Sequence, residues 1–188
     1  ELDIAFAAEL AAGYYRIALL ADDEAVAEGA LAVAPAACYR PPALRDGGRA
    51  WGAAVQLYAL RSRRNWGIGD FGDLAEALAH WGEAGGDFVG VNPLHALFPH
   101  DPARASPYSP SSRLFLNPLY IDVESLPEFA ASAAARALAA SPAFRDELAA
   151  LRDAALVDYP GVAAAKHRVL ALVYADARRA RTAKARER

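Results

Sequence analysis

The most constraining feature of the sequence is an apolar segment, a helical pattern and a second apolar segment between residues 54 and 92. The run 54–60 (AVQLYAL) suits a buried strand, and 88–91 (FVGV) suits another. Between them Leu74, Leu78 and Trp81 recur at helical spacing. We predict two adjacent parallel strands near 54–60 and 87–92, joined by a right-handed crossover through a helix near 71–84. The pattern therefore predicts an α/β fold.

A glycine-rich loop, 65–73 (NWGIGDFGD), precedes the predicted helix. Its letters fit the dinucleotide pattern G-x-G-x-x-G, but Asp70 lies inside the turn and would repel a pyrophosphate. We interpret the loop as a turn that ends at an N-cap, Asp70, with Asp73 placed to complement the helix dipole. Three glycines, at 82, 85 and 86, are expected to end the helix.

Ligands of such units bind at the carboxyl ends of the strands, which directs attention to residues 61–70 and 92–118. The segment 92–118 is rich in proline and serine and has no helical period. Long loops without regular structure are often functional. Ser106 and Tyr108 lie among its prolines. The hydroxyl groups could simply form turns, or they and the exposed ring could form a rigid platform for a sugar.

Composition excludes several classes of protein. The sequence has no run of 18 apolar residues and no signal peptide, so we expect no membrane partner. The net charge of −3 gives no general attraction to nucleic acid. A single cysteine, Cys38, excludes an internal disulfide and favours a reducing, cytoplasmic setting. His95 and His100 share one loop, but no recognised ligand spacing surrounds them, and we expect no metal.

Charge divides the chain near Leu126–Pro127. Residues 1–126 hold 9 basic and 16 acidic side chains, whereas 127–188 hold 11 basic and 7 acidic ones. We predict three regions: 1–48 as the end of an N-terminal β-domain with a linker, 49–126 with the strand–helix–strand unit, and 127–188 as a helical subdomain. The chain contains no methionine and begins at Glu1, so we expect it to be a piece of a longer protein.

The outer regions carry simpler patterns. In the first, 13–20 and 30–34 read as strands, with a polar turn at 21–24. In the last, Ser141-Pro142 begins a helix, and 159–161 (YPG) separates it from another. We predict that the two helices bury these apolar side chains: Phe144, Leu148 and Leu151 in the first, and Val162, Val169, Leu172 and Val173 in the second.

Three long blocks of the sequence carry a resemblance to a known family. They are 55–74 (VQLYALRSRRNWGIGDFGDL), 91–99 (VNPLHALFP) and 106–122 (SPYSPSSRLFLNPLYID). The blocks closely resemble the amylomaltase family of 4-α-glucanotransferases, glycoside hydrolase family 77. The resemblance implies the first βαβ portion of a (β/α)8 TIM barrel, preceded by the end of an N-terminal β-domain and followed by a helical insertion.

The resemblance also implies an activity. The family transfers α-1,4-glucan segments between maltooligosaccharides by a retaining double displacement and needs no cofactor. Its catalytic carboxylates lie on later strands, so no residue of this chain is expected to be catalytic. Ser106 and Tyr108 match substrate-binding positions, and Asn92, His95 and Asn117 lie in or beside matched motifs. The implied partners are α-1,4-glucans, and a piece of a closed barrel is also expected to self-associate.

Two other functions remain open at this stage. The chain could be a carbohydrate-binding module without catalysis, binding through Tyr108. It could also be a structural piece of a related starch-acting barrel.

Overall fold

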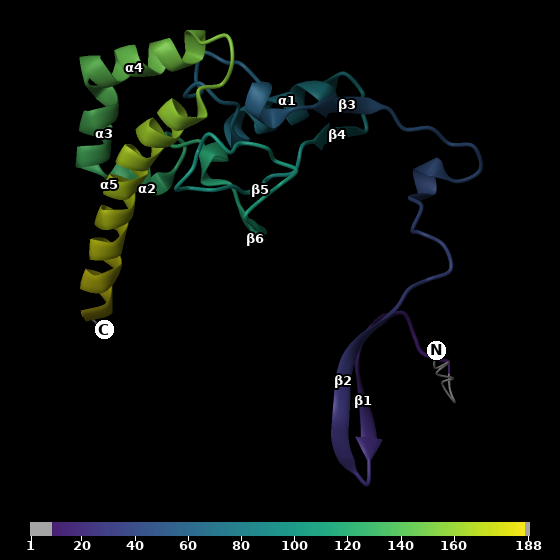
Figure 1. The fold of residues 1–188 in the computed structure, drawn as a ribbon. Helices are drawn as coiled ribbons and strands as arrows, with labels where there is room; N and C mark the ends of the chain where they lie inside the picture. The colour runs from purple at the N-terminus through teal and green to yellow at the C-terminus, as the bar shows by residue number, and fades with distance from the viewer. Residues whose placement is uncertain (1–8, 187–188) are drawn as a thin grey trace. The chain divides into compact units, whose positions relative to one another are not determined.

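The structure, a computed structural model, describes residues 9–186 of the 188-residue chain. The chain divides into two compact units, Glu1–Arg49 and Ala50–Arg188, and Figure 1 traces both. Among the helices of the described residues, none combines the length and the hydropathy that a membrane crossing demands.

The first unit is built around an antiparallel hairpin. β1 (Gly13–Ala21) pairs with β2 (Glu24–Val33), and η1 (Pro42–Leu44) follows. The turn between the strands, predicted at 21–24, places Asp22 and Asp23 at φ 50° and 64°, a left-handed conformation that aspartate tolerates. The prediction that the second strand begins at residue 30 is wrong, because pairing with β1 extends it back to Glu24. Alanine and glutamate have low strand propensity, so the sequence alone did not indicate the extension.

The centre of the second unit is the strand–helix–strand arrangement. β3 (Gly52–Val55) lies parallel to β4 (Phe88–Val91), and α1 (Phe71–Glu83) connects them along the chain (Figure 1). The predicted parallel pair with its helix is therefore confirmed. The first strand ends at Val55 rather than at residue 60, and the short helix η2 (Leu57–Ala59) follows. The backbone leaves the strand here because Leu57 N donates to the side chain of Asn92 instead of to a neighbouring strand.

α1 begins as its sequence predicts. The Asp70 carboxylate accepts hydrogen bonds from Gly72 N (3.0 Å) and Asp73 N (3.1 Å). The Asp73 carboxylate in turn accepts from Asp70 N at 3.0 Å, which completes a capping box. At the other end Gly85 has φ 80°, a conformation that glycine adopts at little cost.

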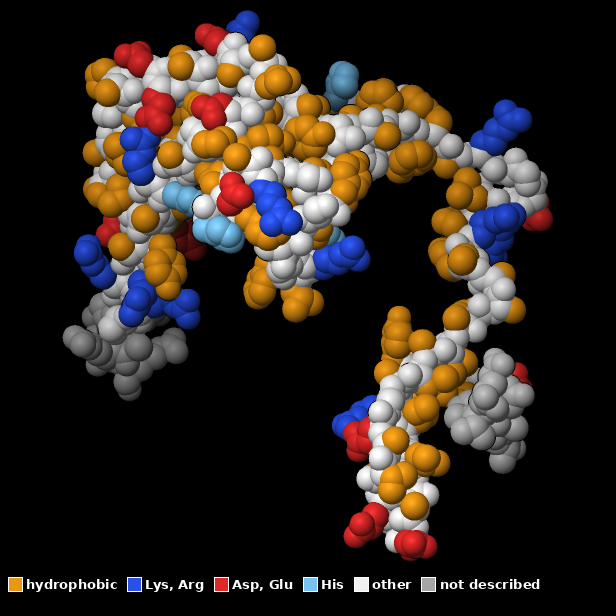
Figure 2. Space-filling model, in the orientation of Figure 1, with side chains coloured by type: hydrophobic (Ala, Val, Ile, Leu, Met, Phe, Trp, Pro, Cys, Tyr) orange, Lys and Arg blue, Asp and Glu red, His pale blue; other side chains and the backbone are white. Residues whose placement is uncertain are grey.

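The segment 92–118, which has no period in the sequence, contains a small antiparallel ladder. β5 (His95–Ala96) pairs with β6 (Ser112–Leu116), and η3 (Pro118–Tyr120) follows directly. Both strands are too short to produce a recognisable pattern. Three consecutive side chains of β6 are exposed: Leu114 by 89%, Phe115 by 69% and Leu116 by 60%. Figure 2 shows hydrophobic atoms at this tip of the unit.

The last elements of the described residues are helices that pack on one another: α2 (Pro127–Ala131), α3 (Ala133–Ala140), α4 (Pro142–Asp153) and α5 (Tyr159–Arg186) (Figure 1). The predicted inward faces are confirmed. Phe144, Leu148 and Leu151 of α4 are buried, as are Val162, Val169 and Val173 of α5, while Leu172 is half-buried. Leu57, Ile68 and Tyr120 belong to the same hydrophobic cluster, so the helices and the loops after β3 and β4 share one core.

Candidate functional site

Asn92 is the first residue after β4, and its side chain joins three segments. Its Oδ1 accepts from Leu57 N at 2.7 Å. Its Nδ2 donates to Tyr120 Oη at 3.0 Å and to Pro93 O at 2.9 Å. The residue is buried, and both amide hydrogens have partners inside the protein. Asn92 therefore fixes where the loops at the strand ends begin.

Asn117 plays a similar local part at η3. Its side-chain oxygen accepts from Leu119 N at 3.0 Å, and Pro118 occupies the first position of the turn. Its backbone N–H donates to Leu94 O at 2.9 Å. Asn117 is buried, whereas His95 is half-buried and pairs in register with Leu116.

Ser106 and Tyr108 lie on the surface of the loop between β5 and β6. Tyr108 is 63% exposed, while the preceding residue, Pro107, is buried and anchors the turn. Ser109 N donates to Ser106 O at 3.2 Å, and Ser111 N donates to Ala96 O at 3.0 Å. The structure thus presents Ser106 and Tyr108 to solvent and places Asn92 and Asn117 inside. The five predicted residues do not line one cavity in the described chain.

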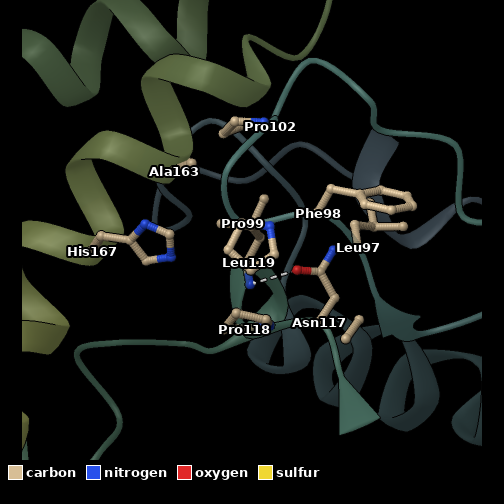
Figure 3. A pocket seen from close by; sticks show the side chains of 10 residues that line it. Leu97, Phe98, Pro99, Pro102, Asn117, Pro118, Leu119, Ala163 and His167 are labelled. Atoms are coloured by element: carbon tan, nitrogen blue, oxygen red, sulfur yellow. Dashed lines mark hydrogen bonds between the residues drawn. The ribbon is translucent and has the colours of Figure 1, made fainter. Parts of the chain in front are cut away.

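An apolar pocket lies beside this loop. It forms where Leu97 and Pro99 approach Leu119 and the α5 residues Ala163 and His167 (Figure 3). Its volume is about 40 Å³. That volume admits no more than a few water molecules, whereas ligand pockets typically span ~300–1,000 Å³. A sugar ring has no room there, so a glucan would have to lie on the exposed face of the loop.

Arg64 forms ion pairs with three carboxylates near the start of α1. Its Nη2 lies 3.0 Å from Asp70 Oδ1 and 2.9 Å from Asp73 Oδ1, and its Nη1 lies 2.7 Å from Asp122 Oδ2. Burial lowers the pKa of Arg64, but the hydrogen bond to Asp70 and the three negative charges outweigh it and raise the pKa overall. Within the described residues, no group of three or more His, Cys, Asp or Glu side chains could hold a metal ion. The sequence analysis missed this arginine, and the run Arg61–Asn65 offered no periodic signal.

Lys166 is a buried lysine on the inward face of α5. It is 1% exposed, and its Nζ donates to Leu119 O and Ile121 O, each at 2.7 Å. Burial lowers its pKa to about 8, against the opposing effect of Asp70 and other nearby carboxylates. The lysine holds the end of η3, the turn that Asn117 begins. Its place between Val162 and Val169 on the apolar face was a signal that could have been noticed.

Two arginines connect the glycine-rich loop and the residues just before it to the C-terminal end of α4. Arg61 Nη2 donates to Ala154 O at 3.2 Å, and Arg152 Nη1 donates to Asn65 O at 3.2 Å. Gly67 has φ 84°, and a Cβ atom there would lie 2.7 Å from Leu151 Cβ. The loop is therefore held closely against the helix.

Comparisons with known proteins agree with one another. The family model for glycoside hydrolase family 77, described as 4-alpha-glucanotransferase, matches residues 55–188. A 4-alpha-glucanotransferase of Haemophilus influenzae is 43% identical over 154 residues, which cover 82% of this chain and 22% of that protein. One of Mycobacterium tuberculosis is 46% identical over 136 residues, covering 68% of this chain and 18% of that protein.

A solved structure is also similar. The amylomaltase from Corynebacterium glutamicum matches with a TM-score of 0.69 and 32% identity, over 88% of this chain and 23% of that one. The present chain thus spans about a fifth of the length of the curated relatives it matches.

Proposed function

The chain belongs to glycoside hydrolase family 77, the 4-alpha-glucanotransferases, and on that premise we propose that it supplies a glucan-binding loop to an enzyme acting on α-1,4-glucans. The reaction is a retaining double displacement. One carboxylate attacks the anomeric carbon of the donor, while a second carboxyl group protonates the leaving oxygen. The second group then accepts the proton of an acceptor hydroxyl, and the glycosyl unit passes to another maltooligosaccharide.

The observation that carries this proposal is the presentation of Tyr108. Its ring is 63% exposed although the residue before it is buried, so the backbone is anchored and the ring faces solvent. The prolines at 107 and 110 restrict the backbone on both sides, which lowers the entropic cost of ordering the loop around a ligand. A sugar ring packed on this face would bury apolar surface of both partners.

The other predicted residues take complementary roles. The exposed Ser106 hydroxyl is available to a sugar hydroxyl, and His95 lies at the base of the same loop. Asn92 and Asn117 are engaged by backbone groups, so we assign them the positioning of the loop rather than contact with the glucan.

None of the carboxylates in the described residues is proposed as the nucleophile or the acid/base. Asp70, Asp73 and Asp122 all lie within 3.0 Å of Arg64, and Asp87 accepts from Trp51 N at 2.9 Å. These four carboxylates are engaged within the protein, and none of them matches the family's catalytic carboxylates, which lie on later strands. The 188-residue chain by itself is therefore expected to transfer no glucose from maltotriose.

We also propose a place for each region in the whole enzyme. Residues 49–126 form the first strand–helix–strand portion of a (β/α)8 barrel, residues 1–48 end an N-terminal β-domain, and residues 127–188 form a helical insertion. The parallel pairing of β3 with β4 supports this arrangement, since parallel strands joined by helices build such barrels.

The test replaces the tyrosine in the full-length protein that carries this chain. Tyr108→Ala should lower kcat/KM for maltotriose disproportionation roughly 10- to 100-fold, from the loss of one buried aromatic contact. Tyr108→Phe, which keeps the ring, should retain most of the activity. Tyr174→Ala is a matched control, because Tyr174 on α5 is 66% exposed and lies outside the loop.

Two results would count against the proposal. If Tyr108→Ala lowers thermal stability and leaves kcat/KM of the folded protein unchanged, the ring only packs the loop. If the full-length protein binds maltooligosaccharides but transfers no glucose, it is a binding protein rather than a transferase.

A further inference from the structure

A second concave surface lies elsewhere in the same unit, between α3, α4 and the loop after η2. We propose that it binds the phosphate group of a small phosphorylated molecule, a ligand class separate from the neutral glucan. The cavity has a volume of about 360 Å³, and its lining includes Arg63, Arg136, Arg145 and Arg152. This volume falls within the ~300–1,000 Å³ typical of small-molecule pockets.

Helical spacing explains why the arginines converge. On α4, Arg145, Leu148 and Arg152 lie three and four residues apart and so share one face. On α3, Arg136 shares a face with Ala139 and Ala140, whose small side chains leave space above them. α3 and α4 meet at a corner, visible in Figure 1, which brings the two faces to one cavity.

Four of the five arginines that line this cavity form no ion pair with another described residue. In the part of the chain that the structure describes, no carboxylate lies within 4.0 Å of the guanidinium of Arg63, Arg136, Arg145 or Arg152. The one acidic residue of the lining is Glu124, which accepts a hydrogen bond from Trp66 Nε1 at 3.0 Å.

Arg64, which also contributes to the lining, illustrates the opposite case. Three aspartates surround it, so its charge is satisfied inside the protein. Arg152 donates one hydrogen bond to Asn65 O, a neutral acceptor. The remaining arginines keep their forks available for an external anion.

The chemistry favours a phosphate monoester over other anions. A guanidinium pairs with phosphate through two parallel N–H···O bonds, and a dianion can satisfy two such forks at once. The cavity floor is apolar, since Phe129 and Leu148 are both buried beneath it. A small molecule with one phosphate group and an organic body would contact both the arginines and the apolar floor of the cavity.

The test measures binding of defined probes to the purified full-length protein that carries this chain, by isothermal titration calorimetry at low and at physiological salt. The probes are inorganic phosphate, glucose 1-phosphate, adenosine monophosphate and an acidic peptide, with adenosine as the uncharged control. We expect both phosphate esters to bind and adenosine not to bind. Binding should weaken with rising salt. The tighter of the two esters identifies a sugar or a nucleoside as the body of the ligand.

Paired substitutions then locate the site. Arg136→Gln with Arg145→Gln should weaken binding of the better ester at least 10-fold, because each removes a charge-assisted hydrogen bond. Both residues are exposed, so circular dichroism and the melting temperature should stay unchanged. Arg178→Gln with Arg181→Gln, on the exposed part of α5, removes the same charge outside the cavity and should leave the affinity within twofold.

Three outcomes overturn the proposal. The first is that no phosphate ester binds the wild-type protein at millimolar concentration. The second is equal loss of affinity in both double variants, which would mean that net charge alone attracts the ligand. The third is that an acidic peptide binds and the esters do not, which would make the surface a protein-binding site.

Discussion

The buried side chain of Lys166 should make the stability of the protein depend on pH. Its pKa is lowered by burial from 10.5 to about 8. Between these two values the unfolded chain binds a proton at this position and the folded protein does not. The contribution of Lys166 to stability therefore rises with pH across this interval and is lowest below pH 8. The neutral amine still has two N–H groups, and both have acceptors in Leu119 O and Ile121 O.

The size of the effect follows from the same values. A difference of one pKa unit between the folded and unfolded states corresponds to about 1.4 kcal/mol of stability, so the full difference for Lys166 corresponds to about 3 kcal/mol. About 2 kcal/mol of this change in stability occurs between pH 7.5 and pH 9.5. Lys166→Met keeps the length of the side chain but has no proton to release. Its stability deficit relative to the wild type should therefore grow by about 2 kcal/mol over these two pH units.

Urea denaturation at several pH values measures this difference, with a constant denaturant slope showing that both proteins unfold in the same way. Tyr159→Phe is a useful control. Burial raises the pKa of Tyr159 to about 12, so this group makes stability fall only above pH 10. A Lys166→Met deficit that stays constant between pH 7.5 and pH 9.5 would refute the reasoning.

Three further predictions concern the loop, the helix start and the surface. Gly67→Ala should destabilise the protein by about 2–4 kcal/mol in thermal melts, because Gly67 has a left-handed φ and a Cβ atom there would clash with Leu151. Gly82→Ala, where a Cβ atom meets open space, should be neutral or stabilising by up to about 1 kcal/mol, and equal effects of the two substitutions would contradict this geometry. Asp70→Ala should lower the free energy of unfolding by about 2–4 kcal/mol, because it removes both the N-cap of α1 and an ion-pair partner of Arg64, whereas Asp70→Ser should restore the N-cap. A loss below about 0.5 kcal/mol in Asp70→Ala would exclude a stabilising role of Asp70. The 188-residue chain should self-associate through exposed apolar side chains such as those of β6, and a concentration-independent monomer in light scattering would disprove this.

The sequence predicted helices and strands well where they depend on contacts between residues close together in the chain. The capping box at Asp70 needs only residues within one turn, and the face made by Phe144, Leu148 and Leu151 needs only helical spacing. The parallel pairing of β3 and β4 followed from the order of strand, helix and strand.

Features that depend on distant residues were missed. β3 ends early because Leu57 N meets the side chain of Asn92, 35 residues away, and no local preference reports such a contact. The arginine-lined cavity arises only when α3 and α4 meet. For the candidate site, the sequence located the loop that carries Tyr108, but it could not separate the exposed Ser106 and Tyr108 from the buried asparagines.

The two bonds that hold the glycine-rich loop against α4 affect how the protein is made. Arg61 and its acceptor are 93 residues apart, and Arg152 and its acceptor are 87 residues apart. At ~5–20 residues per second, the ribosome needs on the order of 5–20 s between synthesis of the loop and synthesis of its partners. During this interval Trp66 and Ile68, which are buried in the folded protein, have no helix to cover them. The nascent chain should then be a substrate for chaperones until α4 has left the exit tunnel.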